Sequence, residues 1–499
     1  MRLIRLYIKE SGILKDFTLD FPQKIDNNIS VFIGENGSGK TTVLESITKI
    51  FSWFIRNERP EFEFELEYQV RVEDKLMESS TWSEFNTSYI WVKLFSNKEI
   101  VDIECHIGKI VLKGLKNIRA SKELLAIKQT IKDNKFKLLP DAIAIYYAGE
   151  STSIKKIVDV HNKDYSEAIR ELYDEEKDFS PRLFFYYEPF HFNLIFLALL
   201  SFEYGNVPEA LEKKIQFNTI HYFTINLKKP HWGNNELKPE EGKFWGAKGT
   251  VAVFLKQLHE LASKTVDTKN GIALHFESKE RFNLYQLKDL YSTEKEFFNI
   301  LEMTWLNDLI DSVDISVTRH ANSQYFAVNS NTFSEGEKQD LIVLGVNELI
   351  LKENSLALFD EPDTYLHPQR QRDFIFELEK HISSSVNIEN DYIITSHSPN
   401  IVAGIKKENL FVFKNGQTKE IPFSSYGKNV ESLLIDFFNV EGVRNKYVEN
   451  LLREVQELVK KKDFMSDNFK SKFNELKDIL RPTAPEIVSI NLEIAKNRK

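Results

Sequence analysis

A glycine-rich loop between an apolar strand and a helix constrains the fold of this chain more than any other feature. Residues Ile29–Ile33 are apolar except for Ser30, which predicts a short buried strand. The chain then reads Gly34-Glu-Asn-Gly-Ser-Gly-Lys-Thr41, and a helix is expected from about Lys40 to Ile55. The pattern G-x-x-x-x-G-K-T in this strand–loop–helix context indicates a loop that cradles phosphate groups.

This loop has the chemistry that a nucleotide phosphate chain requires. Glycines let backbone N–H groups close around the β-phosphate, and the N terminus of the next helix favours an anion. We expect Lys40 to reach the β- and γ-phosphates and Thr41 to supply an oxygen to Mg²⁺. The predicted nucleotide site comprises Gly34, Glu35, Asn36, Gly37, Ser38, Gly39, Lys40, Thr41 and Thr42.

Two adjacent carboxylates follow a second apolar strand. Residues Leu356–Phe359 are apolar and lead directly into Asp360 and Glu361. Asp360 is placed to hold Mg²⁺ through water, and Glu361 is placed to polarise an attacking water as general base. A strand that merely ends in an acidic turn would look the same, but that interpretation fails once the phosphate loop is also present.

Two further motifs complete the set of candidate site residues. Phe333-Ser-Glu-Gly-Glu-Lys-Gln339 precedes the carboxylate strand and opens a helix, where Ser334, Gly336 and Glu337 are candidate phosphate contacts. A serine N-cap followed by glutamate is common in any helix. This motif therefore indicates a phosphate contact only in combination with the phosphate loop and the two carboxylates. His397 ends another apolar strand, Tyr392–Thr395, and is a candidate catalytic residue beside Lys40 and Glu361.

The order of these motifs resembles that of SMC- and RecF-like ABC-type ATPases. The resemblance implies ATP and Mg²⁺ as cofactors, hydrolysis of ATP, and two heads that hold ATP between them. Ser334, Gly336 and Glu337 would then serve the nucleotide of the other head, although Glu335 replaces a glycine of the family signature. His397 would sense the γ-phosphate. Asp363–Pro368 takes the place of the D-loop, and Tyr146–Ser151 is the best candidate for the Q-loop.

The predicted fold class is α/β, an ABC-type ATPase head of the P-loop kind. Further strands are predicted where apolar residues run or alternate. Residues 184–202 are predicted to form one buried helix, because Glu188, His191 and Asn193 interrupt an apolar run too polar for a membrane span. The expected organisation is residues 1–151 and 325–425 as the two parts of the head, 152–324 as an inserted, mostly helical region, and 426–499 as a helical tail. The predicted strands are Arg2–Lys9, Phe17–Phe21, Phe62–Val70, Trp91–Phe95, Val101–His106, Tyr325–Val328 and Leu410–Phe413.

Composition excludes several functions. The net charge is −9 and the pI is about 5.8, which argues against a DNA-binding surface over the whole molecule without excluding a local basic patch. Cys105 is the only cysteine, so no internal disulfide can form. With no signal-peptide pattern and no apolar span, we expect a cytoplasmic location and no membrane contact.

The sequence outside these motifs indicates which branch of the family the chain resembles. Sustained heptads are missing, and so is an Asp-x-Asp pair after His397. The segments LPDAIAIYYAGES and YGKNVESLLIDFFNV resemble the PtuA ATPases of Septu anti-phage systems. That resemblance implies an HNH nuclease partner (PtuB-like) and DNA contacted and cut by the complex. The resemblance to ABC-type heads implies a homodimer or higher homo-oligomer through ATP-sandwiched heads. An AriA-type ATPase with a Toprim partner and a RecF-like repair ATPase remain alternatives.

Overall fold

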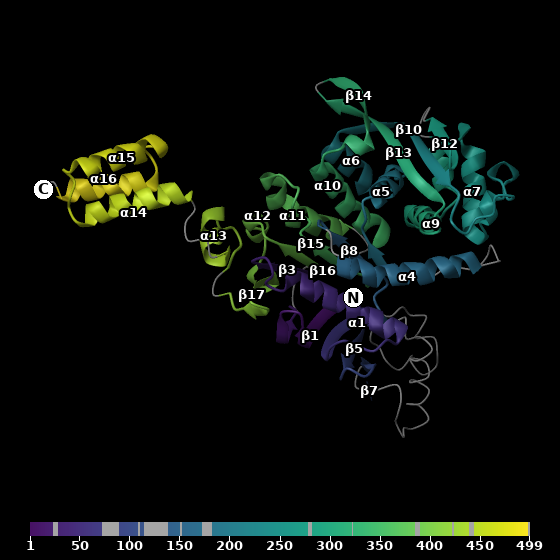
Figure 1. Cartoon of the computed structure of the whole chain (residues 1–499), viewed down its shortest axis with the longest axis horizontal. Helices are drawn as coiled ribbons and strands as arrows, with labels where there is room; N and C mark the ends of the chain where they lie inside the picture. Colours follow the sequence, from purple (N-terminus) through teal and green to yellow (C-terminus); the bar gives the residue numbers. More distant parts are fainter. Residues whose placement is uncertain are drawn as a thin grey trace. The chain divides into compact units, whose positions relative to one another are not determined.

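The computed structural model describes two compact units, Met1–Tyr426 and Gly427–Lys499 (Figure 1). No helix within the described part of the chain is long and apolar enough to cross a membrane. The described residues are 1–22, 28–71, 89–107, 110–113, 138–149, 152–171, 182–277, 282–321, 323–384, 390–421, 424–438 and 444–497.

A seven-stranded sheet carries the phosphate loop in the larger unit. Its strands run parallel except for the edge strand β18, and their sequences are almost entirely apolar, as expected for a sheet covered on both faces. In parallel strands all carboxyl ends meet at one edge, which is where ligands bind in such sheets. In spatial order the strands are β18 (Gln417–Lys419), β17 (Leu410–Lys414), β3 (Ile29–Gly34), β16 (Asp391–Ser396), β15 (Leu356–Asp360), β8 (Ile143–Tyr147) and β9 (Phe184–Tyr186).

A six-stranded antiparallel sheet lies on the other side of helix α1 (Lys40–Arg56). The helix is buried on both sides: Phe51 contacts Tyr68 of the antiparallel sheet, and Val43, Leu44 and Ile47 share one core with strands of both sheets. The order of the antiparallel sheet is β2 (Leu14–Asp20), β1 (Arg2–Ser11), β4 (Phe64–Arg71), β5 (Tyr89–Ser96), β6 (Val101–Ile107) and β7 (Ile110–Lys113).

The inserted region holds a third sheet that the sequence analysis missed. Five antiparallel strands pack beside the helices α5, α7 and α9 (Figure 1), and none of β10–β13 was expected, although helices still hold more residues of the described insertion than strands do. Strand β10 escaped prediction because Thr224 is buried between Phe223 and Ile225, which interrupts the alternation of polar and apolar residues. Their order is β11 (Lys264–Asp267), β12 (Gly271–Glu277), β10 (Phe217–Lys228), β13 (Ile310–Ala321) and β14 (Gln324–Asn329).

The hairpin β13–β14 also corrects a boundary. The limit predicted between residues 324 and 325 falls at the start of β14, which pairs with β13 from Gln324 to Asn329. The strand predicted at Tyr325–Val328 exists, but it belongs to the inserted sheet rather than to the head. Strand order in space depends on pairing partners, which the local pattern of a single strand does not specify.

Helices of the insertion surround this sheet. The helix predicted over residues 184–202 is wrong at its start, because Phe184–Tyr186 form strand β9 and α5 begins only at His191. Pro189 lacks a backbone N–H and its ring would clash with the preceding turn, so no helix runs through it. The helices are α4 (Thr152–Glu171), α5 (His191–Leu200), α6 (Asn206–Ile215), α7 (Gly249–Leu261), α8 (Phe282–Lys288) and α9 (Glu294–Leu306).

The remaining head helices flank the parallel sheet, and the described residues of the smaller unit form four helices. The smaller unit has its own apolar core, in which Val448, Leu451 and Val455 of α14 contact Phe469 and Phe473 of α15. The head helices are α10 (Glu335–Gly345), which continues into a π-helix over Val346–Ile350, α11 (Pro368–Ser384) and α12 (Pro399–Val402). The smaller unit contains α13 (Val430–Phe438), α14 (Lys446–Lys460), α15 (Asp467–Ile479) and α16 (Pro485–Asn497).

Candidate active site

The loop after β3 requires glycine where it turns. At Gly34 φ is 150°, and a Cβ there would lie 2.3 Å from the carbonyl oxygen of Phe413 in the neighbouring strand. Gly39 has φ 111° and caps the N terminus of α1. Any side chain at Gly34 would push β17 away, so the glycine pattern follows from the close approach of the loop to the sheet. Glu35, Asn36 and Gly37 lie exposed at the tip of the loop.

The Lys40 ammonium lies at the centre of the site. Its Nζ donates to the carbonyl oxygens of Gly34 at 2.9 Å and Glu35 at 3.2 Å, and it lies 3.1 Å from Nε2 of His397. Burial lowers the pKa of Lys40, and the carboxylates of Glu361 and Asp360 act in the opposite direction. The structure therefore brings two of the predicted catalytic residues, Lys40 and His397, into contact from segments 357 residues apart.

Asp360 ends strand β15 beside the first turn of α1. Its Oδ2 accepts a 2.7 Å hydrogen bond from the Thr41 hydroxyl, and its Oδ1 accepts one from the Thr395 hydroxyl. Burial raises the pKa of Asp360, while the two threonine hydroxyls lower it. A carboxylate beside a hydroxyl is a fitting donor set for Mg²⁺, which prefers oxygen and keeps several waters or phosphate oxygens of its own.

Glu361 and His397 form the next pair. Nε2 of His397 lies 2.8 Å from Oε1 of Glu361. The His397 hydrogen bond lowers the pKa of Glu361, against a smaller opposing effect of burial, so this carboxyl is ionised at neutral pH. Glu361 has a left-handed backbone with φ 55°, and its N–H donates to the Thr395 carbonyl. Such a conformation is strained in a residue other than glycine and marks the turn at which the side chain leaves the strand.

The signature residues lie in a second cluster at the N terminus of α10. The Ser334 Oγ accepts from the Glu337 N–H, and the Glu337 carboxylate accepts from the Ser334 N–H, so the two residues form a capping box. Ser334 is exposed, and a Cβ at Gly336 would lie 3.1 Å from the Tyr365 carbonyl oxygen. Thr42, the last predicted member of the nucleotide site, lies in the first turn of α1, where its carbonyl accepts from Ser46.

The segment after Glu361 connects the two clusters. The amide of Gln339 in α10 donates to the Pro362 carbonyl and accepts from the Tyr365 N–H at 3.2 Å, and its side chain is buried. Asp363 accepts from the Ser396 hydroxyl at 3.0 Å, and burial raises its pKa to about 6. Neither Gln339 nor Thr395 was predicted from the sequence to be a site residue. Thr395 is the last residue of the predicted strand Tyr392–Thr395, and this place at a carboxyl strand end is the signal that could have indicated its role.

The Q-loop candidate is described only in part. Tyr146 and Tyr147 end β8, next to β15, and the N–H of Ala148 donates to the Asp360 carbonyl. Residues 150 and 151 lie outside the described residues. With Tyr187, Lys338 and Tyr365, the two tyrosines line a cavity of about 730 Å³ beside α10.

Comparison with known proteins fits this geometry. Residues 1–402 match the family model described as an AAA ATPase domain, and the chain belongs to that family. The fold is thus that of a P-loop ATPase of the α/β class. A curated relative, the Retron Ec83 probable ATPase of Escherichia coli, is 32% identical over 143 residues. The match covers 28% of this chain and only 25% of the relative, so the chain spans about a quarter of the relative it matches.

Solved structures of SMC heads are also similar. An Smc head bound to the C-winged helix domain of ScpA has 11% identity and a TM-score of 0.36, covering 85% of this chain and 98% of the other. The SMC head domain from Thermotoga maritima has 11% identity and a TM-score of 0.32, covering 85% of this chain and all of the other.

Proposed function

We propose that this chain binds Mg-ATP at the loop after β3 and hydrolyses it with Glu361 as general base. One observation carries the proposal: Lys40, Thr41, Asp360, Glu361 and His397 meet at the carboxyl edge of three neighbouring parallel strands. Phosphoryl transfer to water needs a cation on the phosphates, oxygen ligands for Mg²⁺ and a base for the water. A named side chain meets each requirement: Lys40 for the phosphates, Thr41 and Asp360 for Mg²⁺, and Glu361 for the water.

The contacts assign a separate task to each residue. The Lys40 ammonium, now bonded to two loop carbonyls, is positioned to exchange them for phosphate oxygens. Thr41 and Asp360 would hold Mg²⁺, which when bound neutralises charge on the phosphates. Glu361 is ionised and half-exposed, so it can accept a proton from water. His397 contacts both Glu361 and Lys40 and therefore links the base to the phosphate side.

We infer further that two copies hold ATP between them. The signature turn lies in a cluster separate from the contacts of Lys40, and its capping residue Ser334 is exposed. A helix N terminus with free N–H groups attracts phosphate. Tyr365, between the two clusters, is 51% exposed on a loop that joins Glu361 to α11. A second copy that presents this turn to the nucleotide would complete the site.

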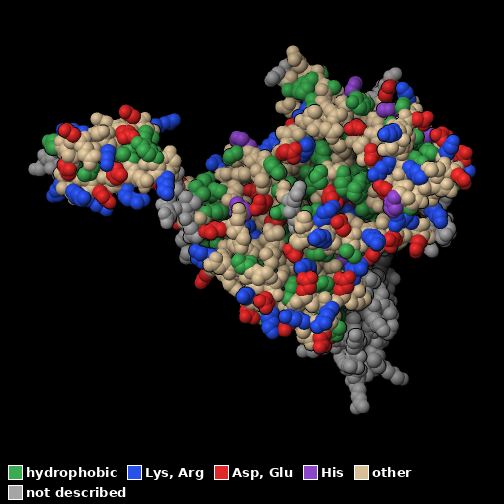
Figure 2. Space-filling view, in the orientation of Figure 1, with side chains coloured by type: hydrophobic (Ala, Val, Ile, Leu, Met, Phe, Trp, Pro, Cys, Tyr) green, Lys and Arg blue, Asp and Glu red, His purple; other side chains and the backbone are tan. Residues whose placement is uncertain are grey.

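The proposed biological role is that of a sensor and scaffold in an anti-phage defence complex with an HNH nuclease partner that cuts DNA. Support comes from the resemblance of its motifs to PtuA ATPases and from the partial match to a retron ATPase. Lys and Arg side chains are interspersed with Asp and Glu on the visible face of the larger unit (Figure 2), which suits a complex whose partner makes the principal DNA contacts.

The mass of the protein in solution tests the ATP-bound dimer. Glu361→Gln removes the base and should trap the closed form, so its mass measured by light scattering should double when Mg-ATP is added. A matched Glu361→Gln variant that also carries Lys40→Ala should remain monomeric with or without ATP. An unchanged mass for Glu361→Gln at saturating Mg-ATP would refute the dimer.

Co-purification tests the partner. Tagged Glu361→Gln protein is recovered from its native host, and the bound proteins are identified by mass spectrometry. An HNH nuclease at near-fixed stoichiometry would support the proposed complex. A Toprim protein, repair proteins or no partner would contradict it and leave only the ATPase.

A further inference from the structure

Two carboxylates lie in the first turn of α10, where the proposed dimer would place a triphosphate. Anions are favoured at a helix N terminus, but acidic side chains beside it repel an incoming phosphate. Here each carboxylate has a cation of its own. Lys338 Nζ lies 2.8 Å from Glu335 Oε1 on the surface, and Arg319 Nη1 lies 2.7 Å from Glu337 Oε1 in a largely buried contact.

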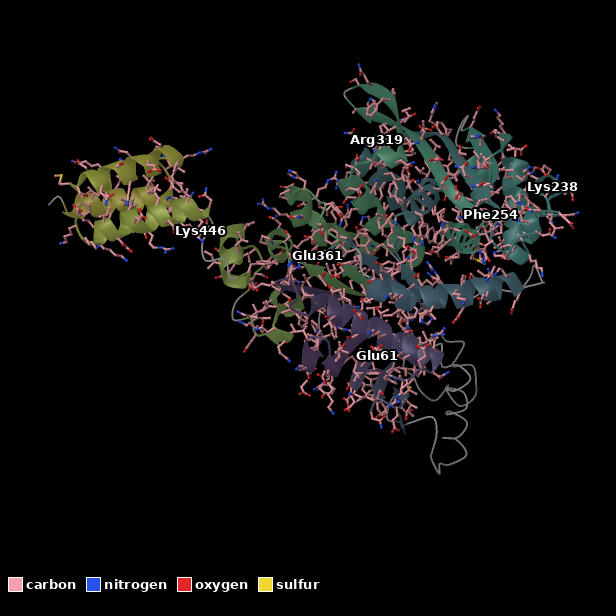
Figure 3. The ribbon with its side chains drawn as sticks, viewed as in Figure 1. Glu61, Lys238, Phe254, Arg319, Glu361 and Lys446 are labelled. Atoms are coloured by element: carbon pink, nitrogen blue, oxygen red, sulfur yellow. The ribbon has the colours of Figure 1, made fainter. Side chains whose placement is uncertain are left out.

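Arg319 comes from the inserted sheet rather than from the head. It lies on β13 (Figure 3). In the strand register it pairs with Phe217 of β10 on one side and Phe326 of β14 on the other. Its guanidinium carbon lies 4.0 Å from the ring centroid of Phe333, the residue before the N-cap. The Nε and Nη2 atoms are buried and have no hydrogen-bond partner among the described residues. Glu337 is therefore the residue that neutralises this buried cation.

The contact extends through Glu337 to the capping serine. Oε2 of Glu337 accepts from the Ser334 N–H at 2.9 Å and from the Ser334 hydroxyl at 3.0 Å, while Oε1 accepts from Arg319. Burial raises the pKa of Glu337, but the hydrogen bonds from Ser334 and Arg319 outweigh it, so the carboxyl stays ionised. Arg319, Glu337 and Ser334 thus form one continuous chain of contacts.

A second set of contacts ties β13 to the segment before the signature. Asp314 of β13 accepts from the Asn331 amide at 3.2 Å, and Asn331 accepts from Asn193 of α5 at 3.1 Å. Asn193 also accepts from the Ser330 hydroxyl at 2.8 Å. The strand therefore contacts both ends of the segment that leads into α10, so a shift of β13 would move the signature turn.

We propose that Arg319 is a positioning residue for the signature turn, which neutralises Glu337 and orients Ser334 toward the triphosphate held by a second copy. This role rests on the proposed ATP-bound dimer. It makes the inserted sheet part of the ATP site, because the cation that the turn requires is supplied by β13. A displacement of β13 would then weaken the dimer without changing the hydrogen bonds of Lys40.

The ATP concentration at which the dimer forms tests this role. All variants are made in the full chain with Glu361→Gln, and dimerisation is followed by light scattering during an ATP titration. Loss of a hydrogen bond to a charged group corresponds to roughly a ten- to hundredfold change in an equilibrium constant. Arg319→Ala should raise the half-saturating ATP concentration by about that factor. Binding of ATP to the monomer, measured by calorimetry at low protein concentration, should stay within about twofold because the described hydrogen bonds of Lys40 do not involve Arg319 or Glu337.

A second substitution separates positioning from folding. In the Arg319→Ala chain, Glu337→Gln removes the uncompensated charge while its amide oxygen still accepts from Ser334, so dimerisation should recover. Lys338→Ala is the matched control, since an exposed ion pair contributes little and should shift the midpoint no more than about twofold.

The outcomes are distinct. If the parent Glu361→Gln protein does not dimerise with ATP, the proposed function fails and this role fails with it. If the parent dimerises but Arg319→Ala does so at the same ATP concentration, or Glu337→Gln restores nothing, only the positioning role is overturned.

Discussion

Replacing Asp363 by asparagine should stabilise the larger unit at neutral pH and remove part of its pH dependence. Asp363 is 4% exposed and accepts a hydrogen bond from the Ser396 hydroxyl, while its Oδ1 has no side-chain partner among the described residues. Burial raises its pKa from 3.8 to about 6. The folded chain therefore binds this proton more tightly than the unfolded chain does.

The sign and size of the effect follow from proton linkage. Because the pKa is raised on folding, ionised Asp363 destabilises the fold above pH 6, by about 3 kcal/mol for a pKa difference of this size. The penalty diminishes as the pH falls through about 6 toward 4. Asparagine carries no charge, and its carbonyl oxygen can still accept from Ser396. The stability difference between variant and wild type should therefore grow by about 2 kcal/mol between about pH 4.5 and about pH 8.

Urea unfolding followed by tryptophan fluorescence measures this difference. The six tryptophans all lie at or before Trp305, so the signal reports the Met1–Tyr426 unit and not the helical tail. Other groups with raised pKa values, such as the buried Asp391, are present in both proteins and cancel in the comparison. If the difference in unfolding free energy is the same at both pH values, ionised Asp363 does not destabilise the fold and the prediction is refuted.

Three further substitutions test the site. Lys40→Ala should weaken ATP binding by roughly ten- to hundredfold, because a charge-assisted contact to phosphate is lost; normal binding by calorimetry would contradict the phosphate-loop assignment. Glu361→Gln should bind ATP like wild type but turn it over roughly 10²- to 10⁴-fold more slowly, and a phosphate-release assay that finds wild-type turnover would disprove the general base. Gln339→Leu should leave the Pro362 carbonyl and the Tyr365 N–H unpaired and lower the free energy of unfolding by about 1–3 kcal/mol; an unchanged urea midpoint would show that these bonds do not join α10 to the loop.

Local patterns were sufficient for the parts of the site that depend on neighbouring residues. The strand at Ile29–Ile33, the loop and the helix from Lys40 are observed where the sequence predicts them, with the helix one residue longer at Arg56. Ser334 caps its helix and forms a capping box with Glu337, which is the alternative interpretation of this motif, while its role as a phosphate contact stays a prediction. In each case the interacting groups lie within a few residues of one another, so the chain needs no distant partner to specify them.

Contacts between distant segments determine the elements that the sequence did not predict. The sheet β10–β14 was missed because a strand is stabilised by its neighbours, and β10 finds its partner β13 about ninety residues later. The same holds for the short strand β9, which joins the edge of the parallel sheet beside β8. Helix α5 begins after Pro189 rather than at Phe184, because the apolar run is divided between strand β9 and helix α5.

The sequence by itself determined the phosphate loop, the two carboxylates after β15 and the capped turn of α10, because each is specified by residue types at short spacing. Only the tertiary structure decided that His397 contacts both Lys40 and Glu361, that Thr395 shares Asp360 with Thr41, and that Arg319 neutralises Glu337. Those contacts arise where parallel strands end at one edge or where an inserted strand packs on a head helix. Their geometry is set by which strands lie side by side, and strand pairing between distant segments is specified by the packing of the whole unit rather than by any single segment.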